Sequence, residues 1–425
     1  MERLKQACIN KHFRGLTTQN ERLFQEIERL KPEMVAALAE LVHVPAVAPE
    51  NGGEGENLKA EKLMEILEKA GFDKIERFDV ADYRVSSGRR PNIIAYLNGE
   101  SNTKRLWIVT HIDVVPSGEE SLWTVTKPFE PLVTNDRVFG RGCEDNGQSL
   151  VASLFAAKAL KNLSLTPKRT IALALVSDEE QGSAYGIQHL LAKGLFRKDD
   201  LVVVPDGGNA NGSFIEVIEK SLIWFRIRTV GKQIHASLPD KGLNAHRIGM
   251  QVALALDKRF HGRFSDRDEF FDVPYSTFEP TKKERNVEAI NIIPGEDIVY
   301  FDCRVLPSYD VEEVVAEINR VLVEFEAKTG ATIKLEIIQN QPAPKLLNNN
   351  AEIVTLLKKA LKTARGFDAQ VGGIGGGSCA AFFRKAGIPA ALWSTVDEVA
   401  HQPNEYCKIN NMIADAKVFA LLFTA

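Results

Sequence analysis

Short apolar runs recur along the chain with helical segments between most of them, and this alternation limits the fold more than any other feature of the sequence. Each run has the length of a strand, and several are apolar at nearly every position, as strands are when both faces are covered. The pattern predicts an α/β fold with a largely parallel sheet. The runs are NIIAYL (92–97), RLWIVT (105–110), TIALALV (170–176), LVVVP (201–205) and AALWSTV (390–396).

The segments outside these runs predict helices. Residues 20–43 carry apolar side chains at helical spacing, with Pro32 as the expected break or restart point. Residues 57–70 present a second apolar face, and Gly71 can adopt the left-handed conformation that caps a helix end. Further helices are expected at 149–162 and 185–193.

The stretch from about residue 221 to 338 has a different order of elements. It contains a strand (LIWFRIRTV), a helix (245–260), two strands (NVEAINII and DIVYFDCRV), a helix (311–327) and a strand (TIKLEII). This β-α-β-β-α-β order is that of a ferredoxin-like domain. Because 425 residues are too many for one ordinary core, we expect a catalytic domain in two parts, 1–220 and 340–425, with a small domain inserted at 221–339.

Composition argues against several classes of protein. The formal net charge is −4, and no Lys/Arg cluster is long enough to bind nucleic acid. The five cysteines are scattered without CxxC spacing, which predicts a reducing compartment rather than a disulfide framework. The N-terminus has no apolar signal region, and no window reaches the ~20 apolar residues of a membrane span. We therefore expect a soluble, cytoplasmic protein without nucleic-acid or membrane partners.

Histidines and carboxylates follow four of the apolar runs. In open α/β sheets, ligands bind in the crevice beyond the carboxyl ends of the strands. Any one of these residues alone would be an ordinary polar strand end or a solvated loop, but four strands ending in the same ligand types indicate a metal site. The residues are His111 and Asp113, then Asp178, Glu179 and Glu180, then Asp206, and finally Asp397, Glu398 and His401.

A further carboxylate, Asp145, lies in FGRGCEDNGQSLVASLFAAKAL (139–160), where a Gly-rich turn leads into a helix. By itself Asp145 could be a turn or N-cap residue. Two histidines with several carboxylates form a donor set that suits Zn²⁺, with Co²⁺ or Mn²⁺ possible. The carboxylates are numerous enough for two ions, and a two-metal centre can activate water and polarise a carbonyl. The sequence therefore predicts a hydrolase of amides.

These motifs resemble those of a known family, the dinuclear-zinc amidohydrolases and peptidases that include succinyl-diaminopimelate desuccinylase, acetylornithine deacetylase, aminoacylase, carboxypeptidase G and the carnosinase-type dipeptidases. The similarity extends from about residue 20 to the C-terminus and keeps the family's order. The motifs are HIDVVP, GRGCEDNGQ, SDEEQGS, VPDGG, GKQIHASLP, NIIPGE, DCR, GGIGGGS and AHQPNE.

The resemblance implies a role for each residue of the metal site. His111 and Asp206 would hold one metal, Glu180 and His401 the other, and Asp145 would bridge them. Glu179 would be the general base, which takes a proton from the water between the metals and passes it to the leaving amine. Asp113 would assist catalysis by orienting His111. A cis peptide is also expected between Asp145 and Asn146.

The small domain would be the family's lid and dimerisation domain. His235 would cross from the partner subunit to stabilise the oxyanion, with Asn291 beside it. Arg304 would bind a substrate carboxylate, and Ser378 would belong to a substrate loop at 375–379.

The sequence departs from the family pattern at two places. Glu144-Asp145-Asn146-Gly147 stands where the family often has Asp-Asp-Lys-Gly, and Cys379 stands where it often has aspartate. Cys143 is interpreted as a packing residue.

The resemblance therefore implies a dimeric two-zinc hydrolase of a small N-acyl amino acid, of the desuccinylase or deacetylase type. The same site hydrolyses peptide bonds, so a dipeptidase or carboxypeptidase is the alternative within the family. A catalytically silent binding protein is a rival of another class. That rival predicts loss of a ligand or of the base, whereas all five ligand positions and Glu179 are filled.

Overall fold

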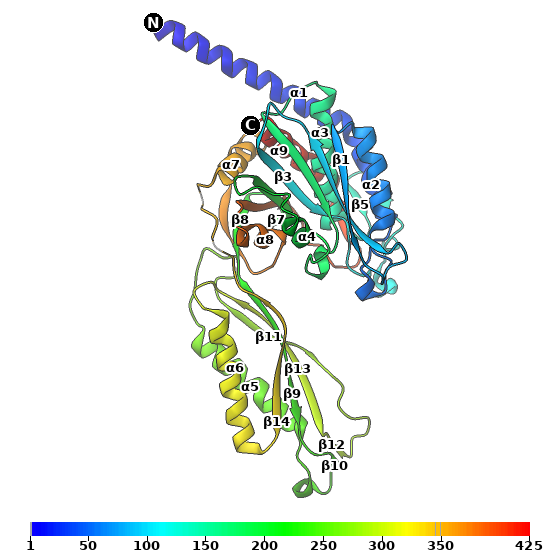
Figure 1. Cartoon of the computed structure of the whole chain (residues 1–425), viewed down its shortest axis with the longest axis vertical. Coiled ribbons are helices and arrows are strands. Elements are labelled where there is room, and N and C mark those ends of the chain that lie inside the picture. Colours follow the sequence, from blue (N-terminus) through cyan, green and yellow to red (C-terminus); the bar gives the residue numbers. More distant parts are fainter. Residues whose placement is uncertain (1, 345, 349) are drawn as a thin grey trace. The chain divides into compact units, whose positions relative to one another are not determined.

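The protein consists of two compact units (Figure 1). The computed structural model describes residues 2–344, 346–348 and 350–425, with side chains from residue 19 onwards. Unit 1 contains residues 1–217, 346–371 and 378–425, and unit 2 contains residues 218–345 and 372–377.

Unit 1 is built on an eight-stranded sheet with the strand order β1-β2-β6-β3-β7-β16-β8-β15. The four central strands, β6, β3, β7 and β16, are parallel, whereas β1, β2 and β8 run antiparallel to their neighbours. All five apolar runs are strands of this sheet, as predicted, although the sheet is mixed at its edges. The strands are β1 (Lys74–Ala81), β2 (Arg89–Leu97), β3 (Ser101–His111), β6 (Arg169–Val176), β7 (Leu201–Asn209), β8 (Phe214–Glu219), β15 (Gln370–Ile374) and β16 (Ala390–Thr395).

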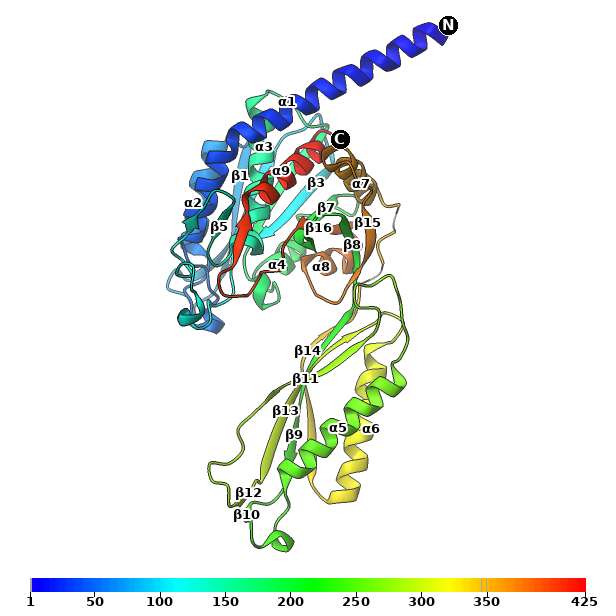
Figure 2. The ribbon, with the colours of Figure 1, turned by 180° about the vertical axis from the view of Figure 1, so that it is seen from behind.

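Helices cover both faces of this sheet (Figures 1 and 2). On one face α1 (Glu2–Val42), α2, α3 and α9 pack against one another, and on the other α8 contacts α4 and strands β7 and β16. The predicted helices at 57–70 and 149–162 are α2 (Asn57–Ala70) and α3 (Ser149–Asn162). Gly71 caps α2 with φ 77°, as predicted. The remaining helices are α4 (Ile187–Ala192), α7 (Glu352–Arg365), α8 (Cys379–Lys385) and α9 (Ile409–Phe423), and a three-stranded sheet is formed by β4 (Leu132–Val133), β5 (Arg137–Phe139) and β17 (Tyr406–Lys408).

The first helix, α1 (Glu2–Val42), is continuous through Pro32, so the expected break at this proline was wrong. Proline removes one backbone hydrogen bond, but packing on both sides of it maintains the helix, since Leu30 and Met34 are fully buried.

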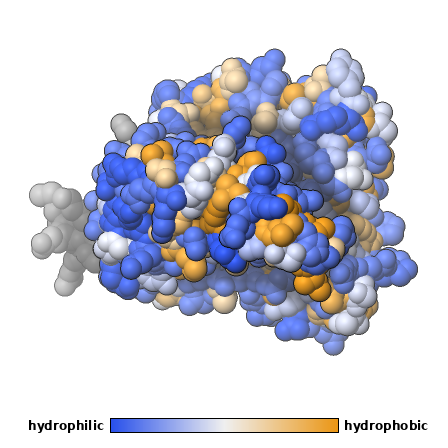
Figure 3. Space-filling view, turned by 90° about the horizontal axis from the view of Figure 1, so that it is seen from below, coloured by the Kyte–Doolittle hydropathy of each residue, from blue (hydrophilic) through white to orange (hydrophobic). Residues whose placement is uncertain are grey.

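Neither this helix nor any other in the described part of the chain is long and apolar enough to cross a membrane. The face seen in Figure 3 is mostly hydrophilic, with apolar residues in smaller groups.

Unit 2 has the predicted β-α-β-β-α-β order. Its four-stranded antiparallel sheet has the strand order β11-β13-β9-β14, which is the ferredoxin-like arrangement. Helices α5 and α6 cover one face of this sheet (Figure 2), and aromatic residues fill the core between them, such as Phe225 stacked on Phe301 with ring centroids 4.9 Å apart. The elements are β9 (Ser221–Val230), α5 (Ala245–Arg263), β11 (Thr277–Lys283), β13 (Glu296–Val305), α6 (Val311–Thr329) and β14 (Thr332–Gln341).

One strand of unit 2 lies elsewhere than predicted. The run NVEAINII is mostly irregular and contributes only the short strand β12 (Ile292–Ile293), which pairs with β10 (Ile234–His235). The edge strand is instead β11, whose sequence TFEPTKK contains a proline and several charged residues. Proline is tolerated on an edge strand, and here the register shifts between Pro280 and Lys282. Charge and proline are typical of protected sheet edges. A search for runs of apolar residues therefore does not detect such a strand.

Candidate metal centre

Parallel strands of unit 1 bring the predicted ligands to one edge of the sheet. His111 is the last residue of β3, and it pairs in register with Val176, the last residue of β6. Glu179 and Glu180 begin a short 3-10 turn, and two residues separate this turn from the end of β6. Asp206 lies on β7, the strand on the other side of β3. Because all three strands run in the same direction, their carboxyl ends meet at this edge.

Asp145 lies between the two histidines. It belongs to the irregular turn Cys143–Gln148 before α3, and the Asp145–Asn146 peptide bond is cis, as expected. One carboxylate oxygen, Oδ1, is 2.8 Å from His111 Nε2, and the other, Oδ2, is 2.9 Å from His401 Nε2. A carboxylate that directs one oxygen to each of two ligands has the geometry of a bridge between two ions.

Each histidine has a second carboxylate beside it. Asp206 Oδ1 is 3.5 Å from His111 Nε2, and Glu180 Oε1 is 3.2 Å from His401 Nε2. Among the described residues, two groups of three side chains have ligand atoms within 4.8 Å of one another: His111, Asp145 and Glu180 form the first, and His111, Glu179 and Asp206 form the second. The structure thus brings all five predicted ligands and the predicted base together in unit 1.

Asp113 supports this site in two ways. Its carboxylate accepts hydrogen bonds from the backbone N–H groups of Glu179 and Glu180, both at 3.1 Å. Its carbonyl oxygen is 3.0 Å from His111 Nδ1, closer than its carboxylate at 3.5 Å. Asp113 therefore contacts His111 chiefly through its main chain, while its side chain holds the turn that carries the two glutamates.

The carboxylates raise the pKa values of both histidines. Burial of His111 opposes its charged form, but Asp206, Asp113 and Asp145 outweigh this effect and raise the pKa of His111 well above its usual range. Hydrogen bonds to Asp145 and then Glu180 raise the pKa of His401 to about 10. When protonated, these histidines supply positive charge to the carboxylates around them.

The pKa values of the two adjacent glutamates are also raised, which for a carboxylate disfavours the charged form. Burial, and then the charge of Asp206, raises the pKa of Glu179 well above its usual range. Burial and Asp145 raise the pKa of Glu180 to about 7. Two divalent cations beside these glutamates would provide positive charge and so stabilise their ionised form. The donor set of two imidazoles and three carboxylates fits such ions, zinc in particular.

A glutamate that we did not single out from the sequence, Glu405, holds the turn around Asp145. Its carboxylate is fully buried and accepts hydrogen bonds from the backbone N–H groups of Gly142, Glu144 and Asp145, at 3.0–3.2 Å. Arg141 pairs with it at 2.6 Å. Although AHQPNE places Glu405 four residues after His401, the sequence does not show that the charge is buried.

Glu144 holds the loop before His401 in the same way. Its carboxylate accepts hydrogen bonds from the N–H groups of Asp397 and Val399, at 2.6 and 2.7 Å, and burial raises the pKa of Glu144 to about 7. Glu144 and Glu405, which we call the loop-binding glutamates, thus each bind the backbone of the other's segment. Asp397 itself points elsewhere and pairs with Lys408 at 2.7 Å.

Asp178, which had no predicted role, anchors the turn that carries Glu179 and Glu180. It has φ 67°, and its carboxylate accepts a hydrogen bond from Tyr185 N–H at 3.0 Å. The buried guanidinium of Arg90 is 3.4 Å from Asp178 and also pairs with the buried carboxylate of Glu56. The three acidic residues after β6 therefore differ in role, because Asp178 faces this buried arginine rather than the metal site.

Asn146 and Cys379, the departures from the family pattern, both lie close to this site. Asn146 donates from Nδ2 to Asp206 Oδ1 at 2.8 Å, and so fixes the orientation of a predicted ligand. Cys379 is buried with its Sγ 3.5 Å from Ser183 Oγ, and burial raises the pKa of its thiol. Cys143 is also a free, fully buried thiol whose pKa burial raises. Both thiols are therefore protonated near neutral pH.

The predicted substrate-binding residues are divided between the units. Ser378, in unit 1, caps α8 by accepting a hydrogen bond from Ala380 N–H. His235 and Asn291 lie on neighbouring segments of unit 2, where Ala236 N–H donates to Asn291 O at 2.8 Å. Arg304 is paired with Asp302 through two nitrogens, at 2.6 and 2.9 Å, and donates to Gly375 O at 3.0 Å.

Comparison with known proteins identifies relatives that share this architecture. A model of peptidase family M20/M25/M40 matches residues 107–425. An uncharacterized metallohydrolase of Methanocaldococcus jannaschii is 39% identical, over 91% of this chain and 98% of its own. Succinyl-diaminopimelate desuccinylase of Nautilia profundicola is 30% identical, over 69% of this chain and 77% of its own. The solved structure of the yeast (Saccharomyces cerevisiae) di-peptidase Dug1p has a TM-score of 0.76 at 19% identity and covers 95% of this chain and 98% of its own.

The raised pKa values predict that metal affinity increases with pH. Protons on His401, whose pKa is about 10, and on Glu180, whose pKa is about 7, compete with the ion. Affinity should therefore rise between pH 6 and pH 8 by about tenfold per pH unit for each proton released. Zinc affinity is measured by competition with a chromogenic chelator whose own pH dependence is known. Equal affinities at the two pH values would contradict the proposed ligand set.

Proposed function

Because the chain belongs to peptidase family M20/M25/M40 and is a metal-dependent hydrolase, we propose that it cleaves the amide bond of a small N-acyl amino acid. The observation that carries this proposal is the position of Asp145, with one oxygen toward each histidine. A relative named succinyl-diaminopimelate desuccinylase supports the substrate class. The proposed ligands are His111 and Asp206 for one ion and Glu180 and His401 for the other.

The proposed ions are zinc, with cobalt or manganese as alternatives. When bound, they would lower the pKa of a water molecule and polarise the scissile carbonyl. The other steps belong to residues of the chain. Asp145 is the proposed bridge between the ions, Asn146 orients Asp206, and Asp113 holds the turn of Glu179 in place.

Glu179 is the proposed general base. Its side chain lies in one ligand group with His111 and Asp206, yet the Nε2 atoms of the two histidines already have Asp145, Asp206 and Glu180 beside them. Glu179 would take the proton from the attacking water and deliver it to the nitrogen of the leaving amine. A base with a raised pKa is suited to both transfers, because it binds the proton firmly enough to carry it.

Residues of unit 2 would complete the reaction. We propose that His235 of the partner subunit, with Asn291 beside it, donates hydrogen bonds to the oxyanion that forms when the carbonyl is attacked. Arg304 would bind the substrate carboxylate. Its guanidinium is held in place by Asp302 and Gly375 O, so a substrate would meet a preorganised donor.

A dipeptidase or carboxypeptidase is the second candidate. The same ligands and base would hydrolyse a peptide bond, and the similarity to the yeast di-peptidase extends over nearly the whole chain. We also propose that the enzyme acts in the cytoplasm, because the four described cysteines are free thiols and such thiols persist in reducing compartments. The side chain of Cys8 lies outside those described.

Substitution of the proposed base tests the catalytic role of the site. Glu179→Gln should lower kcat by about 10²- to 10⁴-fold, while the protein keeps both metal ions. Glu100→Gln, at an exposed glutamate, is the matched control and should leave kcat unchanged. Metal content is determined by elemental analysis. If Glu179→Gln retained both metal and full hydrolysis, the base assignment would be wrong.

A substrate panel tests the reaction class. The zinc-loaded protein is assayed against N-succinyl-diaminopimelate, N-acetylornithine and a set of dipeptides, with release of free amine as the measurement. We expect turnover of an N-acyl amino acid to exceed that of every dipeptide. Preferred turnover of dipeptides would favour the second candidate, and no turnover of any compound would refute both.

Mixing two inactive variants tests the dimer. Glu179→Gln lacks the base, and His235→Ala lacks the proposed oxyanion donor. If His235 acts across the interface of a homodimer, each mixed dimer contains one complete site, so an equal mixture should recover about a quarter of the wild-type activity. Analytical ultracentrifugation establishes that the protein is a dimer, and co-purification of an untagged variant with a tagged one confirms that the subunits exchange. No recovery in exchanged dimers would show that His235 does not act in the partner's site.

A further inference from the structure

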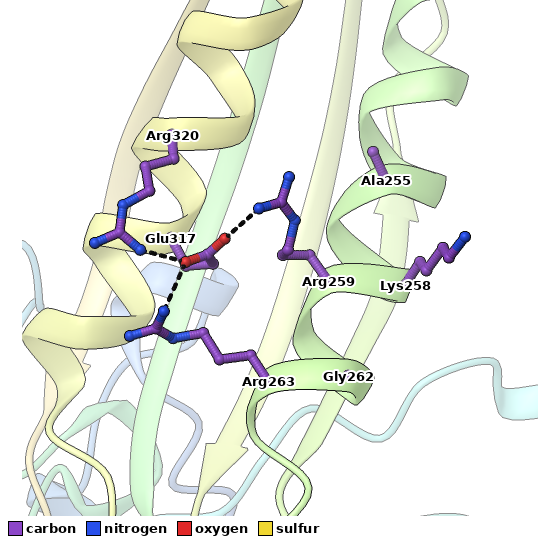
Figure 4. A pocket seen from close by; sticks show the side chains of 7 residues that line it. All are labelled: Ala255, Lys258, Arg259, Gly262, Arg263, Glu317 and Arg320. Carbon is purple, nitrogen blue, oxygen red and sulfur yellow. Dashed lines mark hydrogen bonds and ion pairs between the residues drawn. The ribbon is translucent and has the colours of Figure 1, made fainter.

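A hollow between α5 and α6 of unit 2 is lined by none of the residues discussed above. Its volume is about 590 Å³, which is ample for a small molecule. Four of the residues that line it are cationic, and one is acidic (Figure 4). The chain as a whole has a net charge of −4, so this concentration of positive charge is a local feature. The charged residues are Lys258, Arg259 and Arg263 from α5, and Arg320 and Glu317 from α6.

Three guanidinium groups converge on one buried carboxylate. The Glu317 side chain is 2% exposed, and its oxygens are 2.5 Å from Arg320 Nη1, 3.0 Å from Arg259 Nη1 and 3.4 Å from Arg263 Nη1. Figure 4 shows the arginines reaching this carboxylate from both helices. A buried carboxylate requires a partner, but a single arginine would neutralise it. Glu317 therefore does not account for the other cations.

The three arginines keep donors that face solvent. Their side chains are 42–54% exposed, and each guanidinium carries five N–H donors. Glu317 restricts the rotation of all three, so a ligand would not bear the full entropic cost of ordering them. The result is a preorganised group of donors around one point.

Two glutamates that do not line the hollow compete for these donors. Glu324 is 3.1 Å from Arg259, and Glu313 is 3.3 Å from Arg263. Both carboxylates are about half exposed, and such exposed ion pairs contribute little free energy. An anion with more than one charge could displace them and interact with several arginines together.

Small residues leave space for such an anion. Ala255 and Gly262 line the hollow on α5, and a Cβ atom added at Gly262 would meet nothing within 4 Å. Lys258, on the same helix, points away from Glu317 in Figure 4. Within the described part of the chain, its ammonium group forms no ion pair, and so it remains available to the hollow that it lines.

From these contacts we infer that the hollow binds a phosphate group, either free or carried by a small molecule. Guanidinium groups bind phosphate through paired N–H donors. A dianionic phosphate has oxygens in several directions, which matches donors that approach from two helices. A planar monovalent carboxylate would use fewer of them. The site is independent of the metal chemistry in unit 1.

Calorimetric titration of the full-length, metal-loaded protein tests this inference. The probes are inorganic phosphate, glycerol 3-phosphate and succinate, the last as a dicarboxylate of comparable charge. We expect saturable binding of at least one phosphate compound, and at least about fivefold weaker binding by Arg320→Gln. Lys328→Gln, on the same helix but outside the hollow, is the control and should bind as the wild type does. Tighter binding of inorganic phosphate would indicate free phosphate as the ligand, and tighter binding of glycerol 3-phosphate would indicate a phosphate carried by a small molecule.

A second variant is needed because Arg320→Gln removes a partner of the buried Glu317 and could impair folding. Glu313→Gln/Glu324→Gln removes only exposed carboxylates, and it should bind phosphate more tightly because the competitors are gone. No saturable binding of either phosphate compound by the wild type would overturn the inference. So would binding that Arg320→Gln leaves unchanged, since the phosphate would then occupy another site such as the metal centre. Equal binding of succinate that Arg320→Gln also weakens would overturn the assignment to phosphate.

Discussion

The mutual repulsion of carboxylates at the end of a buried sheet is the constraint on which the rest of this structure depends. Asp145, Glu179, Glu180 and Asp206 lie within a few ångströms of the two histidines. In a low-dielectric setting such a group is unstable without countercharge. Hydrogen bonds to Asp145 and Glu180 raise the pKa of His401 to about 10, and burial together with Asp145 raises the pKa of Glu180 to about 7. Divalent cations would satisfy the same demand and supply the chemistry of hydrolysis.

The surrounding polar groups keep this repulsion from distorting the site. The loop-binding glutamates tie the segment of Asp145 to the segment of His401. Asp113 and Asp178 hold the turn of Glu179 and Glu180 from opposite ends. Each anchor is a buried carboxylate that accepts hydrogen bonds from backbone N–H groups. The positions of the ligands are therefore determined by hydrogen bonds that do not involve metal.

The central strands, and the gathering of the predicted site residues at their ends, could be predicted because each produces a local signal. Apolar runs of strand length identify the sheet, and the polar residues that follow them identify its functional edge. Glu405 escaped notice because nothing in its neighbours shows that it is buried. The break predicted at Pro32 was wrong because packing of the flanking helical turns outweighs the loss of one backbone hydrogen bond. The strand β11 was missed because Pro280 and the charges around it are features of an edge. Whether a residue is buried, or a strand lies at the edge of a sheet, depends on the tertiary structure. Neither property can be predicted from the residues that are adjacent in the sequence.

The central claim is that Asp145 bridges two metal ions, and anomalous diffraction from crystals of the cobalt- or zinc-loaded protein tests it most directly. The account predicts two anomalous peaks about 3.5 to 4 Å apart, one beside His111 and Asp206 and the other beside His401 and Glu180, with one Asp145 oxygen toward each. A single ion between the two histidines, or two ions that Asp145 does not contact, would contradict it.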